Sequence, residues 1–131
     1  MLAGGNGGTM LRYVTFFSYT CQAWERMITK PGNRANAARE LIEEIGGEME
    51  AFYWMLGGWD GLVIYQVPDA ASAAALSGRV TSSGLLKGIS THQLISSDEG
   101  HEALLKAKAI AGAYHPPGAQ RQWRADYELE L

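Results

Sequence analysis

Short alternating segments and longer segments with helical periodicity succeed one another along this chain. Segment 12–19 is dense in aromatic and β-branched residues and predicts a strand. Segment 34–45 repeats apolar residues such as Leu41 and Ile45 at helical spacing and predicts a helix with one apolar face. Between two apolar runs, the glycine-rich segment 57–61 predicts the tight turn of a β-hairpin, because glycine accepts positive φ angles. The full predicted order is strand 12–19, helix 21–28, helix 34–45, strands 48–56 and 62–67, helix 70–80, strand 86–95 and helix 97–113.

This order predicts an α+β fold of the ferredoxin-like βαββαβ type, followed by a C-terminal helix and a strand-like tail. Such a fold has a four-stranded antiparallel sheet with helices on one face only. We expect Tyr13, Thr15, Phe17 and Tyr19, which share one side of the first strand, to lie on the uncovered face. An aromatic surface of this kind is too apolar for free exposure. We therefore expect two chains to pair face to face, as a homodimer or within a larger homo-oligomer.

The end of the chain alternates apolar and charged residues. Trp123, Tyr127, Leu129 and Leu131 fall on one side of this segment, which predicts a strand with one buried face. We expect it to pair with a sheet edge or to cross to a neighbouring subunit, with these four residues as oligomer contacts. A loosely packed tail is the alternative. The expected organisation is a glycine-rich extension at 1–9, a domain at 10–113 and a tail at 114–131.

Composition narrows the classes of function. The 131 residues suit one domain, and 11 Lys and Arg against 14 Asp and Glu argue against nucleic-acid binding, which needs a basic excess. One cysteine allows no intramolecular disulfide, and the histidines lack metal-ligand spacing, so we expect neither a metal nor a cofactor. No apolar run approaches about 18 residues, and no signal peptide stands at the N-terminus. The expectation is a cytoplasmic protein without a membrane segment.

Several of these features together resemble the GYD-domain family. In the family's order come Tyr13-Val14-Thr15-Phe16-Phe17, Gly46-Gly47, Phe52-Tyr53, Gly58-Trp59-Asp60-Gly61 and Pro68-Asp69. The resemblance covers roughly residues 10–112, and Trp59 stands where the family usually has Tyr. It implies the dimeric α+β barrel superfamily, in which two ferredoxin-like sheets close around a shared interior. That superfamily includes cofactor-free monooxygenases, isomerases, haem-binding enzymes and ligand-sensing domains, so the resemblance implies a fold rather than a reaction.

Candidate site residues come from the predicted strands. His92 is the candidate general base, with a hydrogen-bonded structural histidine as the favoured alternative. Asp60 can be a catalytic acid, but a carboxylate that bonds nearby backbone amides in an Asp-Gly turn is favoured. The aromatic residues can line a pocket for a planar organic ligand or simply fill a dimer core. The ligand-binding candidates are Tyr13, Thr15, Phe17, Tyr19, Tyr53 and His92.

Two classes of function follow from these observations. The favoured hypothesis is a homo-oligomeric domain that binds a small ligand in a barrel pocket, with or without a cofactor-free monooxygenase-like or isomerase-like reaction. The alternative is a structural or accessory subunit that acts through its tails. The sequence does not decide whether the protein is an enzyme, because no catalytic motif accompanies the candidate residues.

Overall fold

The computed structural model describes residues 8–118 of the chain. The chain divides into two compact units, and the boundary between them in the sequence lies between Leu94 and Ile95. Each unit is described by itself. The predicted oligomer contacts in the tail, at Trp123, Tyr127, Leu129 and Leu131, lie outside the described residues.

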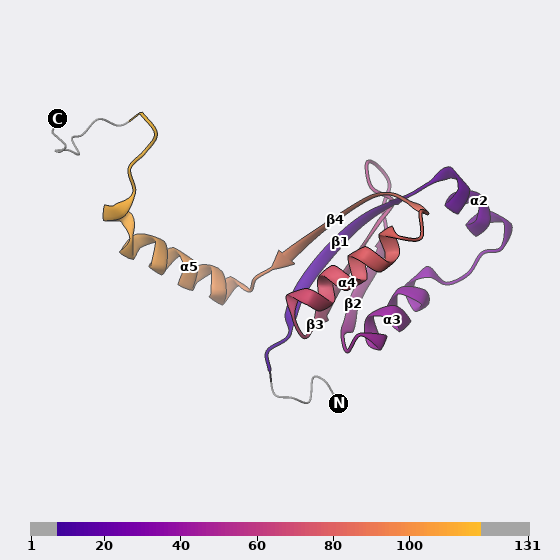
Figure 1. Ribbon diagram of the computed structural model, residues 1–131, viewed down its shortest axis with the longest axis horizontal. Coiled ribbons are helices and arrows are strands. Elements are labelled where there is room, and N and C mark those ends of the chain that lie inside the picture. The colour runs from indigo at the N-terminus through magenta and orange to yellow at the C-terminus, as the bar shows by residue number, and fades with distance from the viewer. Residues whose placement is uncertain (1–7, 119–131) are drawn as a thin grey trace. The chain divides into compact units, whose positions relative to one another are not determined.

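The first unit is a four-stranded antiparallel sheet with helices on one face (Figure 1). The strands lie in the order β2-β3-β1-β4, which confirms the predicted ferredoxin-like α+β fold. Because β1 and β3 are central, each pairs along most of its length with two neighbours. The elements are β1 (Leu11–Tyr19), α2 (Cys21–Thr29), α3 (Arg34–Glu44), β2 (Glu48–Trp54), β3 (Gly61–Val67), α4 (Ala70–Thr81) and β4 (Leu86–Leu94).

Each helix of the first unit begins at a residue type that favours N-caps. The side chains of Thr20, Asn33 and Asp69 each accept a hydrogen bond from the backbone N–H three residues later, at 3.1, 3.0 and 2.8 Å. Hydrogen bonds from Ser72 to the Asp69 carboxylate lower the pKa of Asp69. These local signals explain why the predicted helix starts agree with the structure.

The core lies between the sheet and α3 and α4, and it contains the residues that we expected on the uncovered face. Tyr13 and Phe17 are only 7% and 6% exposed and pack with Ile42 of α3 and Leu76 of α4. The expectation that Tyr13, Thr15, Phe17 and Tyr19 lie on the uncovered face was therefore wrong. Both sides of β1 are apolar, so the alternation of side chains could not indicate which side the helices cover.

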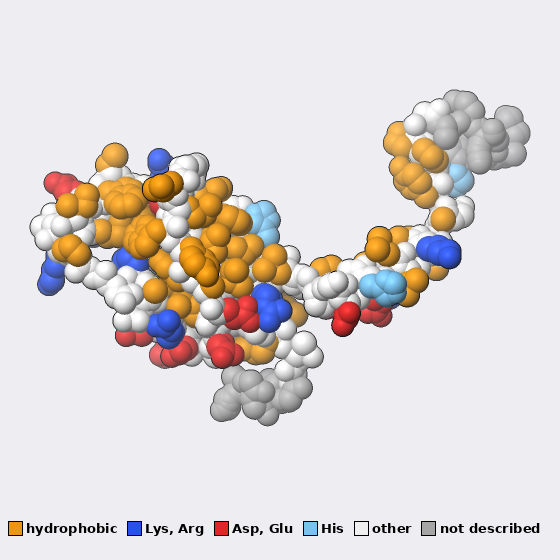
Figure 2. Space-filling view, turned by 180° about the vertical axis from the view of Figure 1, so that it is seen from behind, with side chains coloured by type: hydrophobic (Ala, Val, Ile, Leu, Met, Phe, Trp, Pro, Cys, Tyr) orange, Lys and Arg blue, Asp and Glu red, His pale blue; other side chains and the backbone are white. Residues whose placement is uncertain are grey.

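The opposite side of the sheet, here called the open face, is covered by none of the helices α2, α3 and α4 of the first unit. Its centre consists of Val14 and Phe16 of β1 beside Ile64 and Leu62 of β3, as the strand register shows. Figure 2, which views the molecule from behind, shows hydrophobic side chains gathered over this part of the sheet. Trp59 of the hairpin packs against Phe16, with ring centroids 6.1 Å apart. The strand register and these contacts also place Tyr53, Ser90, His92 and Leu94 on the open face.

The second unit contains α5 (Ser97–Ala109) and a short 3-10 turn, η1 (Ala111–Ala113). Ser96 and Glu99 form a capping box, in which each side chain bonds the other residue's backbone N–H. The predicted helix 97–113 is thus an α-helix that ends earlier and continues as a 3-10 turn.

In the part of the chain that the structure describes, no helix is both long and apolar enough to cross a membrane.

Candidate functional site

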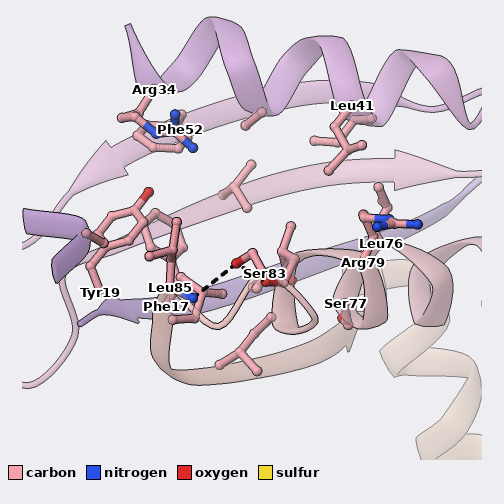
Figure 3. Close-up of a pocket in the computed structure, with 18 of the residues that line it drawn as sticks. Phe17, Tyr19, Arg34, Leu41, Phe52, Leu76, Ser77, Arg79, Ser83 and Leu85 are labelled. Carbon is pink, nitrogen blue, oxygen red and sulfur yellow. Dashed lines mark hydrogen bonds between the residues drawn. The ribbon is translucent and has the colours of Figure 1, made fainter. Parts of the chain in front are cut away.

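A pocket of about 550 Å³ opens between the sheet and the helices α2, α3 and α4 (Figure 3). Phe17, Val63 and Tyr65 line it from the sheet, and Leu41 and Leu76 line it from α3 and α4. Most of its wall is apolar, and several of the wall residues are aromatic. The further lining residues are Thr15, Tyr19, Ala23, Arg26, Met27, Arg34, Ala38, Ile42, Phe52, Ser77, Arg79, Val80, Ser83, Leu85, Leu86 and Ile89.

The pocket is bounded by several elements rather than by one. From α4 its lining residues are Leu76, Ser77, Arg79 and Val80, and the alanines of that helix are not among them. The alanines that line the pocket are Ala23 of α2 and Ala38 of α3. The position of the pocket therefore follows from how three helices lie on the sheet, which no single segment of the sequence indicates.

A chain of four hydroxyl groups joins the floor of the pocket to α4. The Thr15 Oγ1 lies 3.0 Å from the Tyr65 hydroxyl oxygen and 2.9 Å from Thr91 Oγ1, and Thr91 Oγ1 lies 3.1 Å from Ser77 Oγ. Burial raises the pKa of the Tyr65 phenol above its ordinary value, which is itself well above neutral pH. Three hydrogen bonds use three of the four hydroxyl protons. One proton is left for a further acceptor.

The charged residues of the pocket lining are all arginines. Arg26, Arg34 and Arg79 contribute to it, and all three are exposed, which places their charges at the rim. Figure 3 shows Arg34 on the α3 side of the pocket and Arg79 on the α4 side. Among the described residues that line the pocket there is no Asp or Glu.

Asp60 has a structural role that links the hairpin to this pocket. Its Oδ2 accepts hydrogen bonds from the backbone N–H of Tyr19 at 2.8 Å and from the indole N–H of Trp24 at 3.2 Å. These bonds agree with the favoured expectation of a structural carboxylate that bonds backbone amides, and the amide in question belongs to β1. The carboxylate fixes the end of β1, where Tyr19 lines the pocket.

The six predicted ligand-binding residues do not converge on one site. Thr15, Phe17 and Tyr19 line the pocket under the helices. Tyr13 lies in the core, stacked on Tyr65 with centroids 6.0 Å apart, and it does not line the pocket. Two remaining candidates, Tyr53 and His92, lie on the open face. Arg26, Arg34, Arg79 and Ser77 were not among the predicted site residues, because charged and small residues on amphipathic helices most often face solvent.

His92 contacts its neighbours on the open face. Its Nε2 lies 2.7 Å from Ser90 Oγ, and its ring meets the edge of Phe16 with centroids 6.1 Å apart. Within residues 8–118, no carboxylate hydrogen-bonds the other ring nitrogen, so the third group of a catalytic triad is not found there. In the same range, no group of three or more His, Cys, Asp or Glu side chains is arranged to hold a metal ion.

The fold and the covered sheet face define a ferredoxin-like α+β domain. The family model of the GYD domain matches residues 13–104, more than half of the chain. The chain belongs to the GYD-domain family, which confirms the resemblance inferred from its motifs.

Comparison with solved structures found similarity to an AsnC family transcriptional regulator from Agrobacterium tumefaciens. The identity is 19% and the TM-score is 0.46. The alignment covers 74% of this chain and 57% of the regulator's chain, so this chain spans less than two thirds of that protein. Comparison with curated proteins gave no match.

Proposed function

We propose that this GYD-domain protein binds a small organic ligand in the pocket between its sheet and its helices. The observation that carries the proposal is the pocket itself, about 550 Å³ with a mainly apolar wall and a hydrogen-bonded polar chain at its floor. Ligand pockets in proteins have volumes of about 300–1,000 Å³ and the same combination of apolar wall and few polar groups. The sequence favoured a site inside a barrel, whereas the pocket on the helix-covered side of the sheet supports a site there instead.

The apolar lining of the pocket supports an occupant. The pocket opens to solvent at its arginine rim, so without a ligand its apolar wall is in contact with water. A ligand that fills the pocket removes this apolar surface from water and provides dispersion contacts to the lining atoms.

The test uses the neutral fluorophore N-phenyl-1-naphthylamine, which brightens in apolar surroundings. We expect the full chain to bind it, and Ala38→Phe, which fills the pocket from α3, to weaken binding about tenfold or more. Ala74→Phe is the matched control, since Ala74 is exposed on α4 and outside the pocket. Absence of binding to the full chain, or equal binding by Ala38→Phe, would contradict the proposal.

We further propose that the protein is a homodimer joined through its open face. Its central residues Phe16, Leu62 and Ile64 are only partly buried within one chain, although they are apolar. A second copy that covers this face would remove that surface from water at about 25 cal/mol per Å². At the border of the face, Arg12 and Glu50 form a bidentate ion pair with two 2.8 Å contacts, which suits a polar rim.

The dimer is tested by light scattering after size exclusion. We expect twice the chain mass for the unmodified protein and the monomer mass for Phe16→Glu, with an unchanged circular-dichroism spectrum. Gln93→Glu is the control, because Gln93 is exposed and points to the other side of β4. A monomeric unmodified protein, or a dimeric Phe16→Glu, would refute this interface.

A further inference from the structure

We infer that the ligand of this pocket is an anion with an apolar body, whose charged group lies at the rim near Arg34 and Arg79. The inference rests on the proposed ligand-binding function and adds the chemical class. Phe17, Phe52 and Tyr65 provide an apolar and aromatic wall for the body. The positive charges of Arg34 and Arg79 provide the binding partner for the anionic group of the ligand.

The charged residues that line the pocket are basic, whereas the chain as a whole has a negative net charge. The chain has 14 acidic and 11 basic residues, and its net charge is −3. Among the described lining residues, three are arginines and none is acidic. A pocket surrounded by the average surface of this protein would have acidic residues at its rim. The local positive potential therefore favours an anion and disfavours a cation.

The guanidinium groups are available to a ligand. Within residues 8–118, the ion pair of the protein joins Arg12 to Glu50, and Arg26, Arg34 and Arg79 form none with a carboxylate there. Arg39, on the same helix as Arg34, is by contrast bonded to Asn36 at 2.6 Å and does not line the pocket. Guanidinium groups bind carboxylate and similar oxyanions through two parallel hydrogen bonds, which gives direction as well as charge.

The hydroxyl chain supplies a further donor. Because three bonds use three of four protons, Tyr65, Thr15, Thr91 and Ser77 always retain one O–H proton for another acceptor. Ser77 ends the chain on α4 and lines the pocket. With its neighbours donating toward it, the Ser77 hydroxyl donates to an oxygen of the ligand. Hydroxyls also accept hydrogen bonds, so the arginines decide the sign of the ligand's charge.

The experiment compares two probes that share one ring system. The full chain is titrated with 8-anilinonaphthalene-1-sulfonate, an anion, and with N-phenyl-1-naphthylamine, its uncharged counterpart. We expect tighter binding of the anion, weakened by salt, since rim charges are screened. Arg34→Gln or Arg79→Gln should lower the affinity for the anionic probe about three- to tenfold and change the affinity for the neutral probe by no more than about twofold. Arg39→Gln, the matched control, should change neither. In competition, 2-naphthoate should displace the anion better than 2-naphthalenemethanol does.

The possible results distinguish failure of the inferred anionic ligand from failure of the proposed ligand-binding function. If the two probes bind with equal affinity and neither arginine variant changes that affinity, the inference that the ligand is an anion is refuted. The proposed ligand-binding function is still supported in that case if Ala38→Phe blocks binding of the neutral probe. Failure of both probes to bind overturns the ligand-binding function itself.

Discussion

The two faces of the sheet are built from neighbouring residues of the same strands, yet they are stabilised differently. On the helix-covered face, Phe17 and Tyr65 are almost completely buried by elements of their own chain. On the open face, Phe16 and Ile64 are buried only in part, mainly by adjacent strands and Trp59. The comparison shows that apolar content does not identify a core. What distinguishes the faces is whether the helices of the first unit cover them.

The largest expected difference is between Phe17→Ala and Phe16→Ala. Loss of the Phe17 ring from the helix-covered face should lower the free energy of unfolding by about 3–5 kcal/mol. That loss should not depend on protein concentration. Loss of the Phe16 ring should cost about 1–2 kcal/mol in the dilute chain, and more at concentrations where the proposed dimer forms. Urea unfolding at two concentrations measures both, and equal losses at every concentration would remove the distinction between the faces.

Two strand glycines allow a matched comparison. A Cβ at Gly61 would lie 2.5 Å from the Phe17 ring atom Cζ and 2.8 Å from the Tyr53 carbonyl oxygen. A Cβ at Gly88 would meet only Trp59, at an ordinary 3.5 Å. We expect Gly61→Ala to lower the unfolding free energy by about 1–3 kcal/mol and Gly88→Ala to change it by less than about 0.5 kcal/mol. Thermal unfolding would check this, and a destabilised Gly88→Ala would show that the open face is packed as tightly as the core.

The Asp60 carboxylate connects the β2–β3 hairpin to Tyr19 at the end of β1. Replacement by alanine leaves the Tyr19 amide and the Trp24 indole without their acceptor, and we expect a loss of about 1–2 kcal/mol. Trp24→Phe removes one of the two donors together with part of a ring that packs against Tyr19 and Trp54, and it keeps the Tyr19 bond, so it should cost less. Chemical unfolding of both variants gives the comparison, and a larger loss for Trp24→Phe would assign the stabilisation to packing of the indole.

The smallest effect is expected at the edge of the open face. Hydrogen bonds from Arg12 hold the pKa of Glu50 below its ordinary value of 4.5, outweighing the burial that raises it. This stabilisation is present above the ordinary pKa and is lost as the pH falls through the lowered one. Since both side chains are partly exposed, Glu50→Gln should cost less than about 1 kcal/mol at neutral pH. Its unfolding free energy should also fall less steeply in acid than that of the unmodified protein; an identical acid profile would exclude a role for this ion pair.

The sequence predicted the elements of the fold closely, because their boundaries are set by local chemistry. Asp69 caps α4 at its predicted start, and β4 begins at Leu86 as expected. The predicted strand 48–56 ends early, at Trp54, and the Met55 N–H bonds the Asp60 carbonyl where the chain enters the turn. The motifs around that turn also predicted the family.

The site was predicted less well, because its position depends on distant parts of the chain. Both sides of β1 are apolar, so only packing against Ile42 and Leu76 decides which side is covered. Thr15 was expected in the site, but its partners Tyr65 and Thr91 come from other strands, 50 and 76 positions away. Arg79 had no local signal, since its proximity to a pocket follows from how α4 lies on the sheet.

Asp60 also changes what the hairpin motif signifies. Its carboxylate holds the end of β1 and the first turns of α2, both of which border the pocket. Asp60 of the motif therefore has a structural role, because it connects the hairpin to β1 and α2. Residues that line the pocket from α3 and α4, such as Arg34 and Arg79, make none of these hydrogen bonds. Substitutions there can change the pocket and leave intact the bonds that fix the end of β1.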